Sequence, residues 1–463
     1  MPKRLARTPG RLARTAVLVL LGVVVLVGGT VLAVPQWRES VLPSGTVTFS
    51  AGPPPGWRPP QTASPPALPL QALDPSAAPA AKALAARIPK LAEADAGAAP
   101  GLVLLDPQTG KTLVSRGGDK AMMPASTMKV LTSVAALDTL GAERTFTTSV
   151  VSTGKGSIVL RGGGDPLLTD ARRSGRASLQ DLAVATADAL KKAGRTSVSL
   201  GYDASLFTGA SWHPRWTDNY RYSVAPIQAL MVNGGYVAST GKAEDDPAGV
   251  AAKKFGTRLK ALGIKVSSIR PARASGSATE VAAVESPTVA QIIDSVLRYS
   301  NNVAAQVLAR QMGLLTKRGG SFADGQAAVV AALKRLKLWR SGMVIDDNSG
   351  LSRNNRVTGS GLAATVALIL NEPEFQGLAE SLPTGGVSGT LFNRFDDRNE
   401  RAGRGAVWAK TGSLRDVRSL AGFLITADGA PLVFAIQVNQ VKRPLATEDW
   451  IDATIAAWSG CGC

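Results

Sequence analysis

Three short patterns in the sequence combine hydroxyl and amine or amide groups at spacings that could support chemistry. The first is Ser126-x-x-Lys129, within a segment of strong helix formers at residues 124–137. Residues three apart share one face of a helix, so the Lys129 amine can reach the Ser126 oxygen. A serine hydroxyl is a poor nucleophile until a base removes its proton, and a desolvated lysine can be that base. The same spacing recurs at Ser152 and Ser239, where Ser-Thr-Gly-Lys predicts turns.

The second pattern, Ser300-x-Asn302, follows a predicted helix that Ser286-Pro287 opens. The apolar residues of this helix form one stripe, and Ser300 falls on it, so its hydroxyl must find a partner. A helix cap or a junction between helices would explain the same residues, because serine and asparagine favour such positions. A further Ser-x-Asn at Ser352, in a loop rich in glycine and asparagine, leaves this pattern ambiguous when taken alone.

The third pattern is Lys410-Thr411-Gly412, which we expect at the end of a strand. An inward lysine and a hydroxyl at a strand edge suit a carboxylate, and Gly412 would let a substrate backbone approach closely. A near-match to a phosphate-binding loop at Gly110-Lys-Thr112 fails, because position 105 is leucine where that motif requires glycine.

Strands near both ends of the folded region would position these patterns. The expected helices are 80–93 and 447–458. The expected strands are 102–105, 112–114, 406–409, 420–426 and 432–438. Asp428-Gly429 predicts a tight turn between the last two strands. Strands at both ends with helices between them predict an α+β domain whose single antiparallel sheet joins the two ends, with other material inserted in the middle.

The first 79 residues lack the pattern of a folded domain. Five basic residues from Lys3 to Arg14 precede an uncharged run of 19 residues, 16–34, close to the ~20 that cross a bilayer as a helix. The run predicts either a retained membrane anchor or a cleaved signal segment, and in both cases the rest of the chain is exported. Residues 35–79 hold 12 of the 28 prolines and predict an extended linker.

The composition excludes other classes of protein. The formal charge is +18, from 52 Lys and Arg against 34 Asp and Glu, but no basic stripe interleaved with aromatic residues predicts nucleic-acid binding. The charge suits an anionic surface such as a cell-wall polymer or acidic lipid, or reflects only a basic solvated surface. Because His213 is the single histidine and the two cysteines lie far from it, a His/Cys metal site is not expected.

Together and in this order, the three patterns resemble the active-site motifs of penicillin-binding proteins and serine β-lactamases. Within that superfamily, the sequence resembles the class C low-molecular-mass penicillin-binding proteins, the D-alanyl-D-alanine carboxypeptidase/endopeptidases. The resemblance covers about residues 80–460 and departs at Asn301, where the family most often has Asp. Further segments that look like this class are 160–166, 201–207, 347–353 and 382–391.

The resemblance implies a fold and a place of action. It implies a serine β-lactamase/transpeptidase-like domain, an antiparallel sheet flanked by helices, at residues 80–146 and 286–463, with a large inserted domain at 147–285. It also implies a serine DD-peptidase that cleaves D-Ala-D-Ala termini, or also cross-links, of peptidoglycan stem peptides. Such an enzyme would act on the extracytoplasmic face of the bacterial cell membrane, anchored there or secreted.

The resemblance also assigns roles to the pattern residues. Ser126 would attack the carbonyl of the penultimate D-alanine, with Lys129 as base and Ser300 relaying a proton to the leaving amine. Water would hydrolyse the acyl-enzyme without a cofactor, and a β-lactam such as penicillin would acylate Ser126 and stay. The backbone N–H of Ser413 would hold the oxyanion together with that of Ser126. The implied substrate-binding residues are Asn302, Lys410, Thr411, Gly412 and Ser413.

Recognition of the substrate side chain is a separate hypothesis. Asp218 and Arg353 would bind the zwitterionic end of a diamino acid such as diaminopimelate. Trp216 and Tyr222 would form the walls, although the aromatic residues of 212–222 could instead seal the insertion onto the main domain. Two other functions stay open: a serine β-lactamase, and a non-catalytic, membrane-tethered protein that binds the cell wall.

Overall fold

The computed structural model describes residues 79–462 except 93–94, 96 and 155. The predicted membrane segment at 16–34 and the predicted linker, apart from its last residue, lie outside the described residues. Within the described part, no helix is long and apolar enough to span a membrane.

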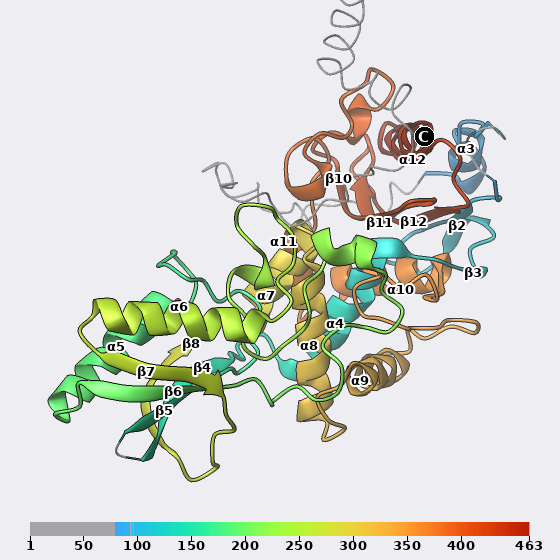
Figure 1. Cartoon of the computed structure of the whole chain (residues 1–463). Helices are drawn as coiled ribbons and strands as arrows, with labels where there is room; N and C mark the ends of the chain where they lie inside the picture. The colour runs from blue at the N-terminus through green and yellow to red at the C-terminus, as the bar shows by residue number, and fades with distance from the viewer. Residues whose placement is uncertain (1–78, 93–94, 96, 155, 463) are drawn as a thin grey trace, which may run out of the picture. The chain divides into compact units, whose positions relative to one another are not determined.

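An antiparallel sheet is built from both ends of the described chain (Figure 1). Its strands lie in the order β10-β11-β12-β1-β2, and each runs antiparallel to its neighbours. They are β1 (Gly101–Leu105), β2 (Thr112–Arg116), β10 (Val407–Leu414), β11 (Val417–Ile425) and β12 (Pro431–Asn439). The predicted sheet that joins the two ends of the chain is therefore confirmed. The predicted turn at Asp428-Gly429 is present, with a φ of 85° at Gly429 that suits glycine.

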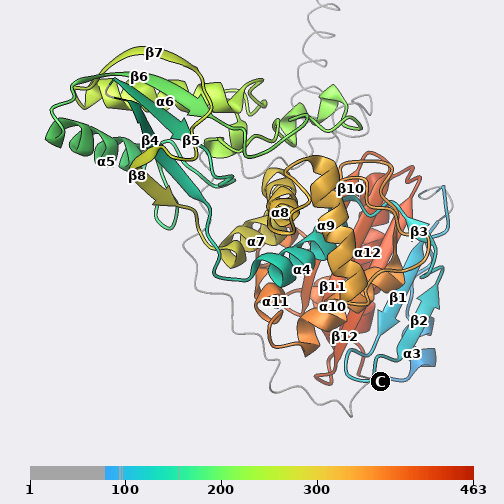
Figure 2. The same ribbon diagram turned by 90° about the horizontal axis from the view of Figure 1, so that it is seen from below.

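Alternate residues of these strands face two different layers, as pleated strands require. On β1, Val103 and Leu105 join one hydrophobic cluster, whereas Leu102 and Leu104 join another. The helices of the first layer cover one face of the sheet (Figure 2). They are α4 (Met128–Leu140), α7 (Val289–Arg298), α8 (Asn302–Leu315), α9 (Phe322–Arg335), α10 (Gly359–Asn371) and α11 (Gly377–Ser381). The helices that pack in the second cluster are α3 (Ala81–Ala86) and α12 (Pro444–Ser459).

The bounds of the two terminal helices differ from the predicted ones for local reasons. Helix α3 ends at Ala86, well before residue 93, because Pro89 lacks a backbone N–H and disfavours helical backbone at Ile88. Helix α12 starts earlier than residue 447, because Pro444 at its first turn needs no hydrogen-bond acceptor there.

A second sheet lies wholly within residues 147–285, in the order β7-β6-β5-β4-β8. Its strands are β4 (Thr147–Gly154), β5 (Ser157–Arg161), β6 (Ser197–Asp203), β7 (Lys265–Pro271) and β8 (Thr279–Glu285). Strands β5, β6 and β7 are parallel, which requires the crossover helices α5 (Leu179–Lys192) and α6 (Pro247–Ala261) between them. These helices and strands share a hydrophobic cluster of their own.

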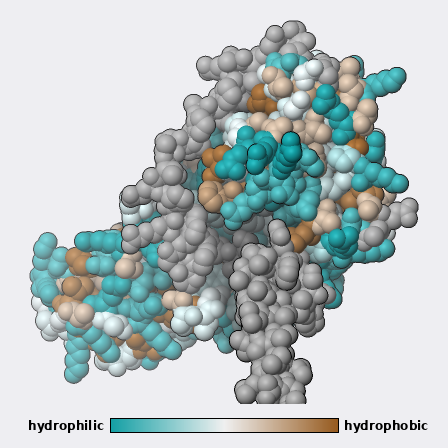
Figure 3. Space-filling model, turned by 90° about the horizontal axis from the view of Figure 1, so that it is seen from above, coloured by the Kyte–Doolittle hydropathy of each residue, from teal (hydrophilic) through white to brown (hydrophobic). Residues whose placement is uncertain are grey.

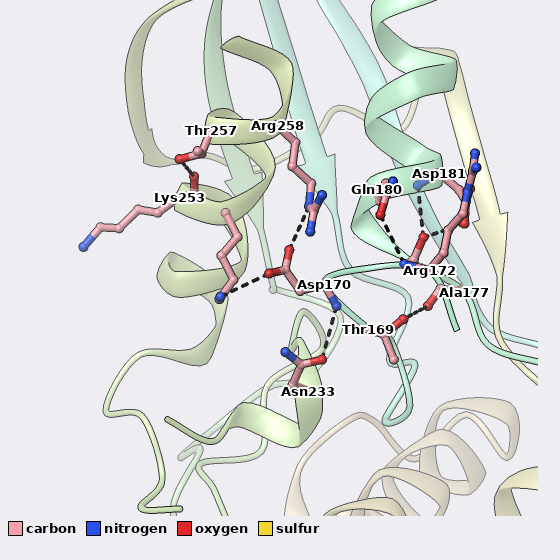
Figure 4. Close-up of polar contacts among 12 residues, drawn as sticks. Thr169, Asp170, Arg172, Ala177, Gln180, Asp181, Asn233, Lys253, Thr257 and Arg258 are labelled. Carbon is pink, nitrogen blue, oxygen red and sulfur yellow. Dashed lines mark hydrogen bonds and ion pairs between the residues drawn. The ribbon is translucent and has the colours of Figure 1, made fainter. Parts of the chain in front are cut away.

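Charged contacts fix the loop that precedes α5 (Figure 4). Asp170 accepts hydrogen bonds from Arg258 Nε at 2.8 Å and from Lys254 Nζ at 3.3 Å, both on α6. Arg172, in the same loop, pairs with Asp181 in the first turn of α5. The loop is therefore tied to both helices of the second sheet.

Among the described residues, few large apolar side chains are exposed. On the face shown in Figure 3, the described residues are mostly hydrophilic, and the hydrophobic ones form small separate patches. A short antiparallel pair, β3 (Ala121–Met122) and β9 (Val357–Thr358), connects the segment before Ser126 to the start of α10. This pair and the first helical layer position the catalytic candidates.

Candidate active site

Ser126 lies in a tight turn that leads into a long helix. The 3₁₀ turn spans Ala125–Thr127 and α4 follows directly, so Ser126 lies in a turn at the start of the predicted helical segment and not in the α-helix itself. Ala125 has a φ of 48°, a left-handed conformation that costs a non-glycine residue about 1–2 kcal/mol. Its carbonyl oxygen packs against Gly350, where a Cβ would lie only 1.8 Å from that oxygen. The loop around Gly350 therefore supports the turn that presents Ser126.

Gly412 supports the same turn from the side of β10. A Cβ at Gly412 would lie 2.2 Å from Ser419 Oγ and 2.7 Å from the Pro124 carbonyl oxygen. That carbonyl accepts hydrogen bonds from Ser419 Oγ at 2.6 Å and from Thr127 Oγ1 at 2.7 Å. Glycine is thus required at position 412 because the nucleophile turn packs on it. The predicted reason, close approach of a substrate backbone, is not needed to explain it.

Lys129 on α4 is fully buried, and its amine has three polar neighbours. Nζ lies 3.0 Å from Ser126 Oγ, 2.6 Å from Asn302 Oδ1 and 2.5 Å from the Ser349 carbonyl oxygen. Burial lowers the pKa of Lys129 to about 7, although the charge of Asp347 opposes this shift. Near neutral pH, a large fraction of this amine is therefore unprotonated and able to accept a proton.

The neighbours of the amine determine where its lone pair points. The Asn302 amide donates from Nδ2 to the Ser223 carbonyl at 2.8 Å, which leaves its Oδ1 facing Lys129 as an acceptor. Oδ1 and the Ser349 carbonyl can only accept, so they take the two hydrogens of the neutral amine. The lone pair is then left for the Ser126 hydroxyl, which is the arrangement that a general base requires.

The corner between α7 and α8 carries Ser300. Helix α7 ends at Arg298, α8 begins at Asn302, and Ser300 between them has a φ of 58°. The helix junction that the sequence left open as an alternative is therefore present, and Ser300 lies in the corner and not on the apolar stripe of the helix. Asn301 caps α8 by accepting a hydrogen bond from the Ala304 N–H at 3.0 Å. An aspartate would make the same bond, so the departure at Asn301 leaves the cap intact.

A buried carboxylate organises the loop that supplies the Ser349 carbonyl. Asp347 is 1% exposed and accepts six hydrogen bonds. The donors are the backbone N–H groups of Ser349, Gly350 and Ser352, the Ser349 hydroxyl, the Asn355 amide and the Trp216 indole. Such charge-assisted bonds are strong and directional, so one side chain fixes the loop that contacts Lys129 and Ala125.

Strand β10 continues to Leu414, so Lys410-Thr411-Gly412 lies inside the strand and not at its end as predicted. β10 is an edge strand, and residues 383–385 pair with only part of its outer edge: Ala409 N–H donates to the Pro383 carbonyl at 2.9 Å. Alternate residues point their backbone N–H groups the same way, so those of Thr411 and Ser413 face the outer edge beyond that pairing.

Lys410 and two threonines form a polar group beside this edge. Lys410 is fully buried, and its Nζ donates to the Thr411 carbonyl at 2.8 Å and lies 3.4 Å from Thr411 Oγ1. Burial lowers the pKa of Lys410 well below its usual value, and the charge of Lys129 lowers it further. Thr411 Oγ1 also lies 2.8 Å from Thr390 Oγ1. An amine beside hydroxyls at a strand edge suits an incoming carboxylate.

The residues predicted to recognise the substrate side chain lie in different surroundings. Trp216 is 5% exposed and supports the buried carboxylate of the loop, so it is not a wall open to solvent, which corrects the prediction for this residue. Tyr222 is 53% exposed, and the side chain of Asp218 is 96% exposed. Arg353 already donates two hydrogen bonds, of 2.7 and 2.8 Å, to Asp416.

Trp216 belongs to an aromatic cluster that connects residues of 147–285 with α9. Its ring centroid lies 5.3 Å from that of Trp212, 5.5 Å from that of His213 and 5.4 Å from that of Phe322. The guanidinium of Arg310, on α8, lies 3.8 Å from the Phe322 ring centroid. For Trp216, this is the packing role that the sequence left open as the alternative.

Several residues that shape the site have no role in the sequence patterns. Ser349 acts through its backbone carbonyl, and Ser223 does the same toward Asn302, so their side-chain types carry no signal. Asp347 stands in a segment that resembles the family, and this was the one available indication of its importance. Ser419 and Thr390 contact the patterns only through the pairing of distant segments.

The chain is similar to known carboxypeptidases along most of its length. The model of the D-Ala-D-Ala carboxypeptidase 3 (S13) family matches residues 81–245 and 238–458. A carboxypeptidase of Mycobacterium tuberculosis is 32% identical over 415 residues, which cover 84% of this chain and 86% of that protein. Carboxypeptidase DacB of Mycolicibacterium smegmatis is 34% identical over 429 residues, which cover 88% of this chain and 89% of that protein.

A solved structure shows the same fold. Penicillin-binding protein 4 (dacB) from Haemophilus influenzae matches with a TM-score of 0.66 at 21% identity, covering 81% of this chain and 98% of that one. The residues of the candidate site therefore lie in a fold that a solved penicillin-binding protein also has. With the family match over most of its length, the chain belongs to the D-Ala-D-Ala carboxypeptidase 3 (S13) family.

Proposed function

We propose that this protein is a serine peptidase that removes the last residue of D-Ala-D-Ala peptides of peptidoglycan through an acyl-enzyme. The observation that carries the proposal is the directed contact between Lys129 and Ser126. A buried amine with a pKa of about 7 lies 3.0 Å from a hydroxyl, and its other two neighbours are acceptors. Family membership supports the choice of substrate.

In the acylation step, Lys129 accepts the Ser126 proton while Oγ bonds to the carbonyl carbon of the penultimate D-alanine. The carbonyl oxygen becomes an oxyanion, which the backbone N–H groups of Ser126 and Ser413 stabilise. When the oxyanion collapses, the peptide C–N bond breaks, and the proton held by Lys129 passes through the Ser300 hydroxyl to the leaving D-alanine nitrogen. The place of Ser300 in the corner before Asn302, which binds the Lys129 amine, supports this relay.

The other residues hold the substrate and complete the turnover. Asn302 orients the substrate amide, and Lys410 with Thr411 binds the terminal carboxylate. A carboxylate that arrives beside the buried Lys410 amine favours the charged form of that amine, so binding and charge reinforce each other. Water then attacks the ester, and Lys129 again accepts a proton. Penicillin would acylate Ser126 by the same first step.

The organisation of the chain around this site is also a proposal. We assign residues 80–146 and 286–463 to the catalytic domain and residues 147–285 to an inserted domain, because the second sheet and its hydrophobic cluster use only residues from that range. The basic residues before an uncharged run at 16–34 support export of the chain and its attachment to the membrane. Export would bring the active site to the outer side of the membrane, where peptidoglycan lies.

Two reactions of the purified protein test the function. We expect intact-mass analysis after incubation with benzylpenicillin to show a single stable adduct, absent in Ser126→Ala, and we expect the wild type to release D-alanine from a D-Ala-D-Ala peptide. Rapid hydrolysis of penicillin without peptide cleavage would identify a β-lactamase. A folded protein that does neither would support the cell-wall-binding alternative.

A further inference from the structure

The turn Gly389–Leu391 brings a threonine from outside the three patterns to the edge of β10. Leu391 is fully buried in the cluster behind the sheet, and its carbonyl accepts a hydrogen bond from the Gly386 N–H at 2.9 Å. On the other side, a Cβ at Gly389 would lie 2.6 Å from the carbonyl oxygen of Arg298, at the end of α7. Thr390 is therefore held between the helix corner that carries Ser300 and the strand that carries Thr411.

The contact between the two threonines is a hydrogen bond whose direction is open in the free protein. Thr390 Oγ1 and Thr411 Oγ1 lie 2.8 Å apart, and either can donate. Lys410 Nζ, at 3.4 Å, is the other neighbour of Thr411 Oγ1, and in the charged form that a bound carboxylate favours it can only donate. A hydroxyl has one proton to donate and two lone pairs that accept, so the Thr411 oxygen can accept from both neighbours at once.

A bound carboxylate removes this freedom. Because a carboxylate only accepts, Thr411 must turn its single proton toward it. Thr390 must then donate to Thr411, which makes a chain in which each hydroxyl polarises the next. We propose that Thr390 is a positioning residue for the terminal carboxylate of the substrate, acting through the Thr411 hydroxyl. This inference rests on the proposed function and adds a specificity residue to it.

The proposal is tested with Thr390→Val, which keeps the shape of the side chain and removes the donor. Thr390→Ser, which keeps the hydroxyl, is the matched control. The substrates are a D-Ala-D-Ala peptide with a free terminal carboxylate and the same peptide as its terminal amide. For the acid, we expect Thr390→Val to lower kcat/KM about 5-fold, mainly through KM, because the loss of one hydrogen bond between neutral hydroxyls is of that order. For the amide, we expect a change of less than about 2-fold.

A double variant separates positioning from general damage. If Thr390 acts through Thr411, Thr390→Val should cost the acid substrate little further in a Thr411→Val background. Thr390→Ser should keep the wild-type preference for acid over amide. An unchanged preference in Thr390→Val, or equal losses for both substrates, would overturn the role of Thr390. If the wild-type enzyme itself shows no preference for the acid over the amide, both the proposed carboxypeptidase function and the role of Thr390 are contradicted.

Discussion

The nucleophile region and the predicted recognition region differ in how their polar groups are satisfied. Around Lys129, the Asn302 amide and the Asp347 carboxylate are buried. Asn302 accepts from Lys129 and donates to the Ser223 carbonyl, and Asp347 accepts from the distant Trp216 indole and from its own loop. By contrast, Asp218 and Tyr222 are exposed, and Arg353 is paired with a carboxylate that is itself partly exposed.

This difference in burial suits the two regions to different tasks: catalysis around Lys129 and recognition of the substrate side chain near Asp218 and Arg353. Buried groups that satisfy one another are in place before a substrate arrives, so no reorganisation is needed at the moment of reaction. Exposed charged groups are already hydrated, so a substrate must displace that water to bind them. The net gain in binding free energy from each such contact is therefore small. Substitutions should therefore have large effects in the first region and small effects in the second.

The largest effect is expected for Lys129→Met, which keeps the length of the side chain and removes the base. We expect the rate of acylation by penicillin to fall by about 10³-fold, the usual contribution of a general base. The matched control is Lys242→Met, because Lys242 belongs to an exposed copy of the same Ser-x-x-Lys spacing and should leave the rate unchanged. Stopped-flow or mass-resolved acylation measures both rates. Equal losses would mean that the spacing and not the burial matters.

The second effect concerns pH. Because only the unprotonated amine accepts the Ser126 proton and burial lowers the pKa of Lys129 to about 7, kcat/KM should rise with pH and level off above about 7. Below that pKa, each unit of pH should cost about 10-fold. Initial rates of D-alanine release between pH 5 and 9 give the profile. A rate that keeps rising toward pH 10 would show that the Lys129 pKa is close to that of an exposed lysine.

The third effect compares two aspartates. Asp347→Asn places an amide where three backbone N–H groups and an indole N–H converge, so we expect a loss of about 3 kcal/mol in the free energy of unfolding. Asp416→Asn changes a partly exposed partner of Arg353 and should cost less than about 1 kcal/mol. Denaturant unfolding measures both values. Similar losses at the two positions would contradict the contrast between the regions.

The smallest effect is expected in the recognition region. Asp218→Asn and Arg353→Ala should lower kcat/KM for a diaminopimelate peptide by less than about 10-fold, since both groups exchange water or an existing partner for the substrate. A peptide without the second amino and carboxyl groups should be cleaved at the wild-type rate by both variants. If turnover of the diaminopimelate peptide is also unchanged, these residues do not recognise the side chain.

The same contrast explains which parts of the molecule could be predicted from the sequence. The sheet that joins the two ends followed from short apolar runs and from the Asp428-Gly429 turn signal, which are local features of the sequence. Ser126, Lys129 and Asn302 could be placed together because their side chains carry the chemistry. The Ser349 carbonyl could not, since every residue has one and only the loop geometry aims it at the amine.

The roles of Gly412 and Trp216 could not be predicted from the sequence, because they depend on packing between segments that are distant in the chain. Gly412 was predicted to admit a substrate, whereas the space is taken by the turn at Pro124, which lies far away in sequence. Trp216 was predicted to face a substrate because aromatic residues often do, yet its indole N–H serves a buried carboxylate. No sequence pattern indicated the parallel strands β5, β6 and β7, whose pairing depends on two crossover helices.

The pairing of β4 with β8 has a consequence for how the chain could have been assembled. Thr147, the first residue of β4, lies opposite Glu285, the last residue of β8, and the Ser286 N–H donates to the Phe146 carbonyl at 3.1 Å. The chain therefore departs and returns at one point, so a whole module could be gained, exchanged or removed there with a short turn left to close the gap. Such an exchange would leave Ser126 and Lys129 in the chain but would replace the Ser223 carbonyl that orients Asn302 and the Trp216 indole that binds Asp347. The module boundary thus offers evolution, or a protein engineer, a way to retune the catalytic amide without altering the residues that react.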